Sequence, residues 1–93
     1  MNLESFGVVT KVEERAGFTG AEVITEESVI ELYPRIVREL GERGYTFVGG
    51  DNEGFEAEMA FLDRRSRNVS FSIRQGCGEQ ILVRVLVQGA KNG

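Results

Sequence analysis

The chain has 93 residues, a formal net charge of −4, 41% hydrophobic residues and no histidine. This length is that of one domain, so residues 1–93 are expected to fold as a single unit around one modest core. The absence of histidine excludes imidazole metal sites and the Ser-His and Cys-His pairs of nucleophilic enzymes, and the acidic balance disfavours general binding to phosphate backbones.

The first element expected is a strand over residues 6–12, with Phe6, Val8 and Val12 on one side of it. Residues 16–20 follow and contain two glycines, which is typical of a loop. We expect this loop to lead directly to a helix.

The helix is predicted over residues 26–43. Thr25 suits the N-cap position and Gly44 suits the end of a helix. Pro34 removes one backbone hydrogen bond from a helix interior, so we expect a bend there; the alternative is that Pro34 opens a second helix. The residues at helical spacing that are expected to be buried are Val29, Tyr33, Ile36 and Leu40.

After the helix the apolar period changes from 3.6 to 2, which is typical of strands. Four strands are expected, over residues 45–48, 55–62, 68–74 and 81–88, with the odd-numbered side chains facing the helix. Because a shift of one residue would expose an apolar set, the shortest hairpins predict the register. They place Phe47 opposite Phe55, Phe61 opposite Val69, Ile73 opposite Ile81, Glu56 opposite Arg74 and Ser70 opposite Arg84.

The predicted order is β-α-β-β-β-β, an α+β fold with a single helix packed on an antiparallel sheet. This order resembles the cystatin-like architecture in topology only. The Gln-x-Val-x-Gly loop by which cystatins block cysteine proteases has no match here, and residues 63–67 occupy the corresponding hairpin region. Protease inhibition therefore does not follow from the resemblance.

No catalytic residue, metal ligand set or cofactor is predicted. Cys77 lies between Gly76 and Gly78 at an expected hairpin tip, without a histidine to activate the thiol. Residues 49–54 are rich in glycine, but they join two strands and lack the Gly-Lys-Ser/Thr ending of a phosphate-binding loop.

Arg64, Arg65 and Arg67 form a basic turn that suits contact with an anion or a charged partner. The alternative is a solvated turn whose arginines pair with glutamates. Nucleic-acid binding is disfavoured, because sheets that bind single strands use exposed aromatic side chains and the aromatic residues here are expected under the helix.

These exclusions favour a non-catalytic protein-interaction module, such as an adaptor, an accessory subunit or an inhibitor. The alternatives are a small-ligand-binding or sensing domain, which needs a pocket between helix and sheet, and an acidic protein that mimics nucleic acid. The first residues lack the features of a signal peptide and no apolar run approaches the ~18 residues of a membrane span, so a cytoplasmic protein without membrane contact is expected.

The predicted interface is on the last strand, where Leu82, Arg84 and Leu86 are expected to point away from the helix. Residues 81–88 are also expected to form an edge strand, which is a template for pairing with another chain. The partner is another protein or a second copy, which would give a homodimer.

Overall fold

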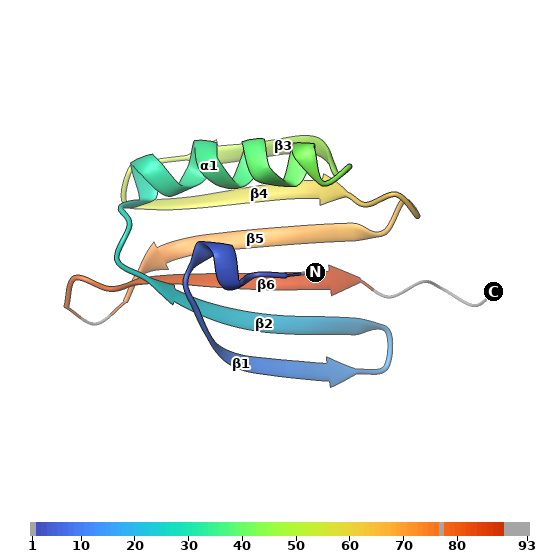
Figure 1. Ribbon diagram of the computed structural model, residues 1–93, viewed down its shortest axis with the longest axis horizontal. Helices are drawn as coiled ribbons and strands as arrows, with labels where there is room; N and C mark the ends of the chain where they lie inside the picture. Colours follow the sequence, from blue (N-terminus) through green and yellow to red (C-terminus); the bar gives the residue numbers. More distant parts are fainter. Residues whose placement is uncertain (1, 77, 89–93) are drawn as a thin grey trace.

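A computed structural model describes residues 2–76 and 78–88 and shows one helix packed on a six-stranded antiparallel sheet (Figure 1). The predicted α+β class is confirmed. A short 3-10 segment, η1 (Glu4–Phe6), precedes the first strand, and the helix is α1 (Val29–Glu42). The strands are β1 (Val8–Arg15), β2 (Phe18–Thr25), β3 (Thr46–Asn52), β4 (Glu56–Leu62), β5 (Asn68–Gln75) and β6 (Ile81–Gln88). Within the described residues, no helix is long and apolar enough to cross a membrane.

The sheet has one strand more than the sequence predicts. The expected loop is only a turn at Ala16 and Gly17, after which Phe18–Thr25 forms β2. The sheet order is β1-β2-β6-β5-β4-β3, so β2 covers the side of β6 that was expected to be free. The prediction that β6 is an edge strand is therefore wrong, and β1 and β3 form the edges.

The helix begins three residues later than predicted. Thr25 Oγ1 accepts a hydrogen bond from Glu27 N–H (3.2 Å), but this closes a turn ahead of the helix. The N-cap is Ser28, whose Oγ accepts from Glu31 N–H (3.3 Å). The helix runs through Pro34 as one element, and Gly44, with φ of +93°, follows its C-terminal end.

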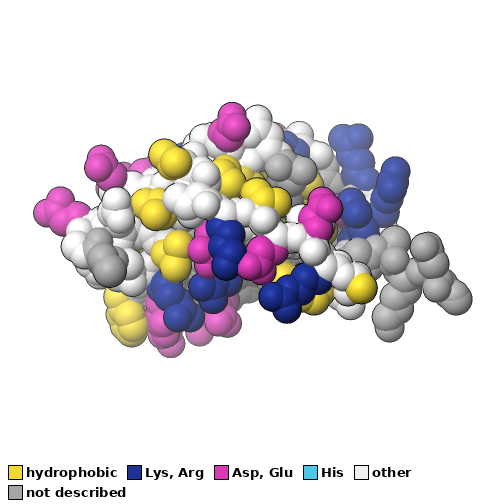
Figure 2. Space-filling model, turned by 90° about the horizontal axis from the view of Figure 1, so that it is seen from below, with side chains coloured by type: hydrophobic (Ala, Val, Ile, Leu, Met, Phe, Trp, Pro, Cys, Tyr) yellow, Lys and Arg dark blue, Asp and Glu magenta, His cyan; other side chains and the backbone are white. Residues whose placement is uncertain are grey.

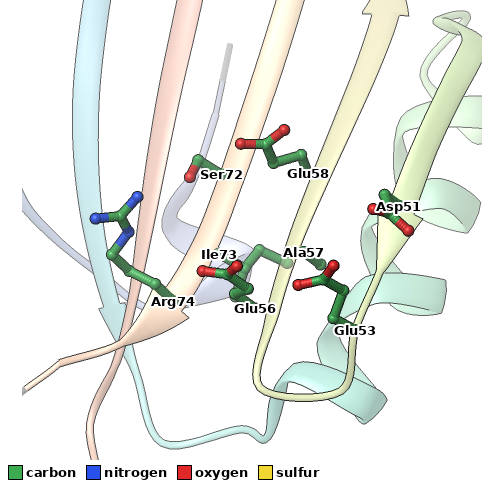
Figure 3. A pocket seen from close by; sticks show the side chains of 8 residues that line it. All are labelled: Asp51, Glu53, Glu56, Ala57, Glu58, Ser72, Ile73 and Arg74. Atoms are coloured by element: carbon green, nitrogen blue, oxygen red, sulfur yellow. The ribbon is translucent and has the colours of Figure 1, made fainter.

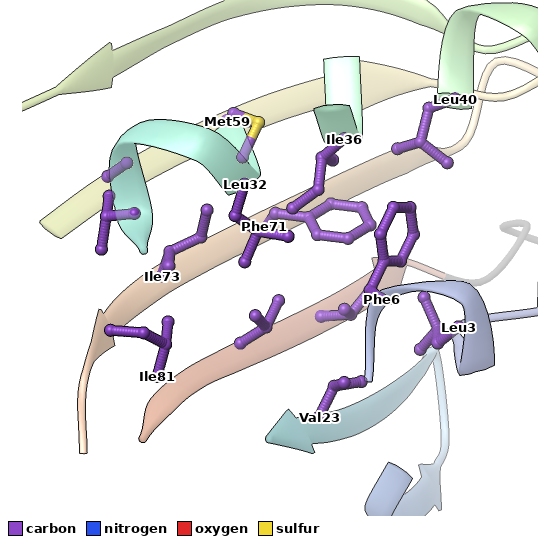
Figure 4. Packing of buried hydrophobic residues seen from close by; sticks show 14 of the residues in the cluster. Leu3, Phe6, Val23, Leu32, Ile36, Leu40, Met59, Phe71, Ile73 and Ile81 are labelled. Atoms are coloured by element: carbon purple, nitrogen blue, oxygen red, sulfur yellow. The ribbon is translucent and has the colours of Figure 1, made fainter. Parts of the chain in front are cut away.

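The core lies between α1 and one face of the sheet (Figure 4). The odd-numbered apolar residues of β4 and β5, and most of those of β6, are buried on this covered face, as predicted. Phe71 packs edge-on against Phe61, with ring centroids 5.8 Å apart. The helix contributes Val29, Leu32, Ile36 and Leu40. Leu32 therefore takes the place expected for Tyr33, which is only partly buried and lies toward the edge strand β3.

The helix covers only part of this face, and the N-terminal segment covers much of the rest. Phe6 of η1 is buried against Phe71, with ring centroids 6.2 Å apart. Arg35 Nη1 donates to the carbonyl oxygen of Ser5 (2.9 Å), and the Arg35 guanidinium lies 5.2 Å from the centre of the Phe6 ring. Arg43 Nη1 donates to the carbonyl oxygen of Asn2 (2.6 Å). Two helix arginines thus hold the N-terminal segment on the sheet.

The register predictions are confirmed only for the β4–β5 hairpin, where Phe61 is opposite Val69 and Glu56 is opposite Arg74. In the β5–β6 hairpin the pairing is shifted by two residues, which preserves the faces. Ile73 is opposite Val83, and Ser70 is opposite Leu86.

The β3–β4 hairpin differs most from the prediction, because β3 continues through the glycines to Asn52. Phe47 is therefore opposite Phe61 and not Phe55. Phe47 and Phe55 are 42% and 63% exposed, so the expectation that both lie under the helix is wrong. A register shift in β1 between Val9 and Lys11 likewise puts Val8 and Val12 on opposite faces rather than on one side.

Candidate functional site

The face of the sheet opposite α1 and η1 is not covered by any described helix or loop (Figure 1). We call it the open face. The strand pairing aligns the side chains of this face in rows that run across the strands, and two of these rows lie at its centre. One row consists of Gly49, Ala60, Ser70, Leu86, Gly20 and Glu13, and the next consists of Asp51, Glu58, Ser72, Arg84, Glu22 and Lys11.

Small side chains hollow out the middle of the open face. A hollow of about 480 Å³ extends across β3, β4 and β5, where Gly49, Ala60, Ser70 and Ser72 line it. Leu86 stands at its β6 rim and is 44% exposed. A projecting leucine beside a shallow hollow gives this face relief and apolar area, both of which suit contact with another surface.

The predicted interface residues Leu82, Arg84 and Leu86 are brought together on this face. They alternate along β6, and each has a neighbour on the open face of β2. Arg84 Nη2 donates to Glu22 Oε2 across that pairing (2.9 Å). Because β6 lies in the middle of the sheet, these three side chains are available for contact through the face and not through the strand edge.

Four carboxylates gather at the end of the open face formed by the β3–β4 hairpin (Figure 3). This acidic cluster consists of Asp51, Glu53, Glu56 and Glu58, and together with Arg74, which lies opposite Glu56, it lines a hollow of about 190 Å³. A hydrogen bond with Glu56 and the charges of Asp51, Glu56 and Glu58 raise the pKa of Glu53. The ion pairs among described residues do not include these four side chains.

The sequence shows these acids but not their convergence, because β3 was expected to end before Asp51. Convergence here does not amount to a metal centre. No group of three or more ligating side chains in the described part of the chain is arranged to hold a metal ion.

The predicted anion-contact residues Arg64, Arg65 and Arg67 lie at the turn between β4 and β5. With Arg43 and Tyr45 they line a hollow of about 250 Å³. Arg67 is engaged internally, since its Nε donates to Asp63 Oδ2 (2.6 Å).

Asp63 organises this turn. Its Oδ1 accepts hydrogen bonds from the backbone N–H groups of Arg67 (2.9 Å) and Arg65 (2.8 Å). These bonds and the Arg67 guanidinium lower the pKa of Asp63, against the effect of burial. Ser66 has φ of +59°, a left-handed conformation that the turn imposes. The arginines are therefore displayed by a structural turn that lies away from the rows of the open face.

The β1 edge of the molecule carries both charges and exposed apolar side chains (Figure 2). Lys11 Nζ lies 2.8 Å from Glu13 Oε1, and Val8 and Val12 are both exposed. Phe18, on the missed strand β2, adds an aromatic side chain to the open face that the sequence interpretation did not place there.

The space between helix and sheet, where a ligand pocket was considered, is filled by the fully buried side chains of Leu32, Ile36 and Leu40. A separate hollow of about 340 Å³ lies beside η1, on the covered face of β1, β2 and β6. Leu3, Val9, Ala21, Val85 and Val87 contribute to its lining.

Cys77, the remaining side chain singled out in the sequence, lies outside the described residues. Its expected position at a hairpin tip stays a prediction.

Comparison with known proteins gives no match to a family model, a curated protein or a solved structure.

Proposed function

We propose that this protein is a non-catalytic protein-interaction module and that the open face of its sheet is the surface that binds. The observation that supports this most directly is the hollow of about 480 Å³ on a sheet face that no described element covers. A sheet usually buries both faces or keeps the outer one polar. Here the outer face has small residues at its centre, with Leu82, Leu86 and Phe18 beside them.

The physical argument is one of apolar area. Each leucine that moves from water into a packed contact contributes roughly 2 kcal/mol. Leu86 is 44% exposed, and the hollow next to it can receive a side chain from a partner. Arg84 and the acidic cluster add charges around this apolar centre, which is the arrangement of an apolar core with a polar rim.

Site-specific photo-crosslinking tests the proposal. A photoreactive phenylalanine analogue placed at Leu86, in cells that express the chain natively, is expected to capture a defined protein. The matched control is Ile30, an exposed apolar residue on α1, which lies on the other side of the molecule. Capture from position 86 but not from position 30 supports the proposal. Equal capture from both positions, or none from position 86, contradicts it.

A small apolar ligand is the second candidate, favoured by the hollow beside η1. Its volume of about 340 Å³ is at the lower end of the range of ligand sites. Ala21→Leu would fill this hollow from β2, so it should abolish binding of an apolar fluorescent probe without lowering stability. Unchanged probe binding by the folded variant would exclude the hollow as a ligand site.

A further inference from the structure

We infer that the partner of the open face is a second copy of this chain, bound face to face about a two-fold axis that runs parallel to the strands between β5 and β6. A second copy as partner presupposes that the open face binds protein, as proposed above. The arrangement follows from the distribution of charge, the distribution of side-chain size and the area of the face.

Charge on the open face is divided between its two halves. The half formed by β3, β4 and β5 carries the four acids of the acidic cluster and one basic side chain on the open face, Arg74, which lies opposite Glu56. The half formed by β1, β2 and β6 carries three basic side chains, Lys11, Arg15 and Arg84, against the two acids Glu13 and Glu22. Both acids already pair within the half, with Lys11 and Arg84. One half is therefore strongly negative and the other weakly positive.

A two-fold axis between β5 and β6 brings these unlike halves together, because it lays β4 over β2 and β3 over β1 of the second copy. Rotation about an axis parallel to the strands places each row of one copy opposite the same row of the second copy. Asp51 then lies over the second copy's Lys11. Glu58 lies over Glu22, whose charge Arg84 already balances within the chain. Asp51 thereby receives an opposite charge from the second copy, while Glu56 already faces Arg74 within its own chain.

The same rotation matches large side chains with small ones. Leu86 of each copy lies over Ser70 of the other, at the hollow that Ala60 and Gly49 widen. In the outer row the match is instead between two large apolar side chains, because Leu62 lies over Phe18. Each copy thus supplies both the projecting leucine and the hollow, as the self-complementary interface of a symmetric dimer requires.

The open face is also large enough. Strands of seven or eight residues that rise about 3.3 Å per residue, six of them about 4.8 Å apart, give the face roughly 600–700 Å². A standard protein interface buries about 800 Å² of accessible surface on each partner. The accessible surface of the open face is larger than its flat area because side chains make it uneven, so the two areas are comparable.

Charge reversal with mixing tests the second-copy arrangement. Light scattering of the wild type should give about twice the mass of one chain. Lys11→Glu and Asp51→Lys, each alone, should weaken association at least about tenfold, because each homodimer then opposes two pairs of like charges. An equimolar mixture of the two variants should recover the wild-type association. In that mixed dimer the introduced glutamate faces the introduced lysine, and the unchanged Asp51 faces the unchanged Lys11.

Arg38→Glu is the matched control, because Arg38 is an exposed arginine on α1. It should keep the wild-type mass, and circular dichroism should show that every variant is folded. A monomeric wild type, or a mixture that associates no better than either variant alone, would overturn the second-copy inference. If the wild type is monomeric while position 86 still crosslinks another protein, the proposed function stands and only the identity of the partner changes.

Discussion

Gly50 is the residue at which the edge strand meets the helix. A Cβ at this position would lie 2.5 Å from Tyr33 Oη and 2.6 Å from the carbonyl oxygen of Glu58. Real Cβ atoms do not approach so closely, so the partly buried Tyr33 can pack on β3 only because residue 50 is glycine. The glycine-rich segment that the sequence interpretation assigned to a loop is thus a strand that fits beneath a tyrosine.

Gly50→Ala should lower the free energy of unfolding by about 1–3 kcal/mol, because the added methyl forces Tyr33 or β4 to move. Gly49→Ala is the matched control: a Cβ there meets no atom within 4 Å, so its effect should stay below about 1 kcal/mol. Urea unfolding of both variants in the Leu82→Glu, Leu86→Glu background measures the difference without a contribution from association, which matters because Gly49 lines the hollow of the open face. Equal effects from the two substitutions would contradict the packing of Tyr33 on Gly50.

The β3–β4 hairpin is the element in which unbalanced charge accumulates. Glu53 lies in its turn, and the hydrogen bond with Glu56 and the surrounding carboxylates raise the pKa of Glu53. A raised pKa means that the folded chain disfavours the Glu53 carboxylate. The charged Glu53 side chain therefore lowers the free energy of unfolding at pH values above its folded pKa. This destabilisation disappears as the pH falls below the pKa of glutamate in the unfolded chain.

Glu53→Gln should consequently raise the urea midpoint of the monomer at pH 7, measured in the Leu82→Glu, Leu86→Glu background to exclude association. The gain should vanish at a pH below the usual glutamate pKa, where Glu53 is protonated in both states. Glu79, outside the acidic cluster, provides the control, and Glu79→Gln should leave the midpoint nearly unchanged at both pH values. A Glu53→Gln variant that is destabilised at pH 7 would refute the repulsion.

Elements with strict alternation were predictable from the sequence, and elements that break it were not. β4, β5 and β6 alternate without interruption, so their covered face was predicted correctly. β2 was missed because Gly20 and Thr19 weaken its alternation and resemble a loop. In β1 and β3 the register shifts reverse the parity on which the prediction relied.

The helix shows a second limit on what could be predicted from the sequence. Thr25 and Ser28 are both residue types that suit the N-cap position, and the structure shows that the backbone turns into the helix at Ser28. A start three residues later does not change the apolar stripe. The buried set nevertheless includes Leu32 in place of Tyr33, because Tyr33 lies toward the edge strand β3, where it is only partly covered.

At the scale of the whole molecule, the residues of the candidate site were predictable from the sequence, but the hollow and the division of charge around them were not. The alternation of β6 was enough to place Leu82, Arg84 and Leu86 on the side away from the helix. The hollow depends on small residues from three other strands, and the charge division depends on the sheet order, which the missed strand β2 determines. A pairing between distant segments leaves no local signal in one sequence.

The most direct test of the open face as a surface that binds a second copy is the mass of the wild type and of the Leu82→Glu, Leu86→Glu variant, measured by light scattering over a concentration series. Burying the carboxylate introduced at position 86 over Ser70 of the second copy, in an apolar contact without a charged partner, is strongly unfavourable, whereas this side chain reaches water in the single chain. The account predicts two chains for the wild type and one for the variant, with the same circular dichroism spectrum for both. A variant that stays associated, or a wild type that is one chain at every concentration, would contradict it.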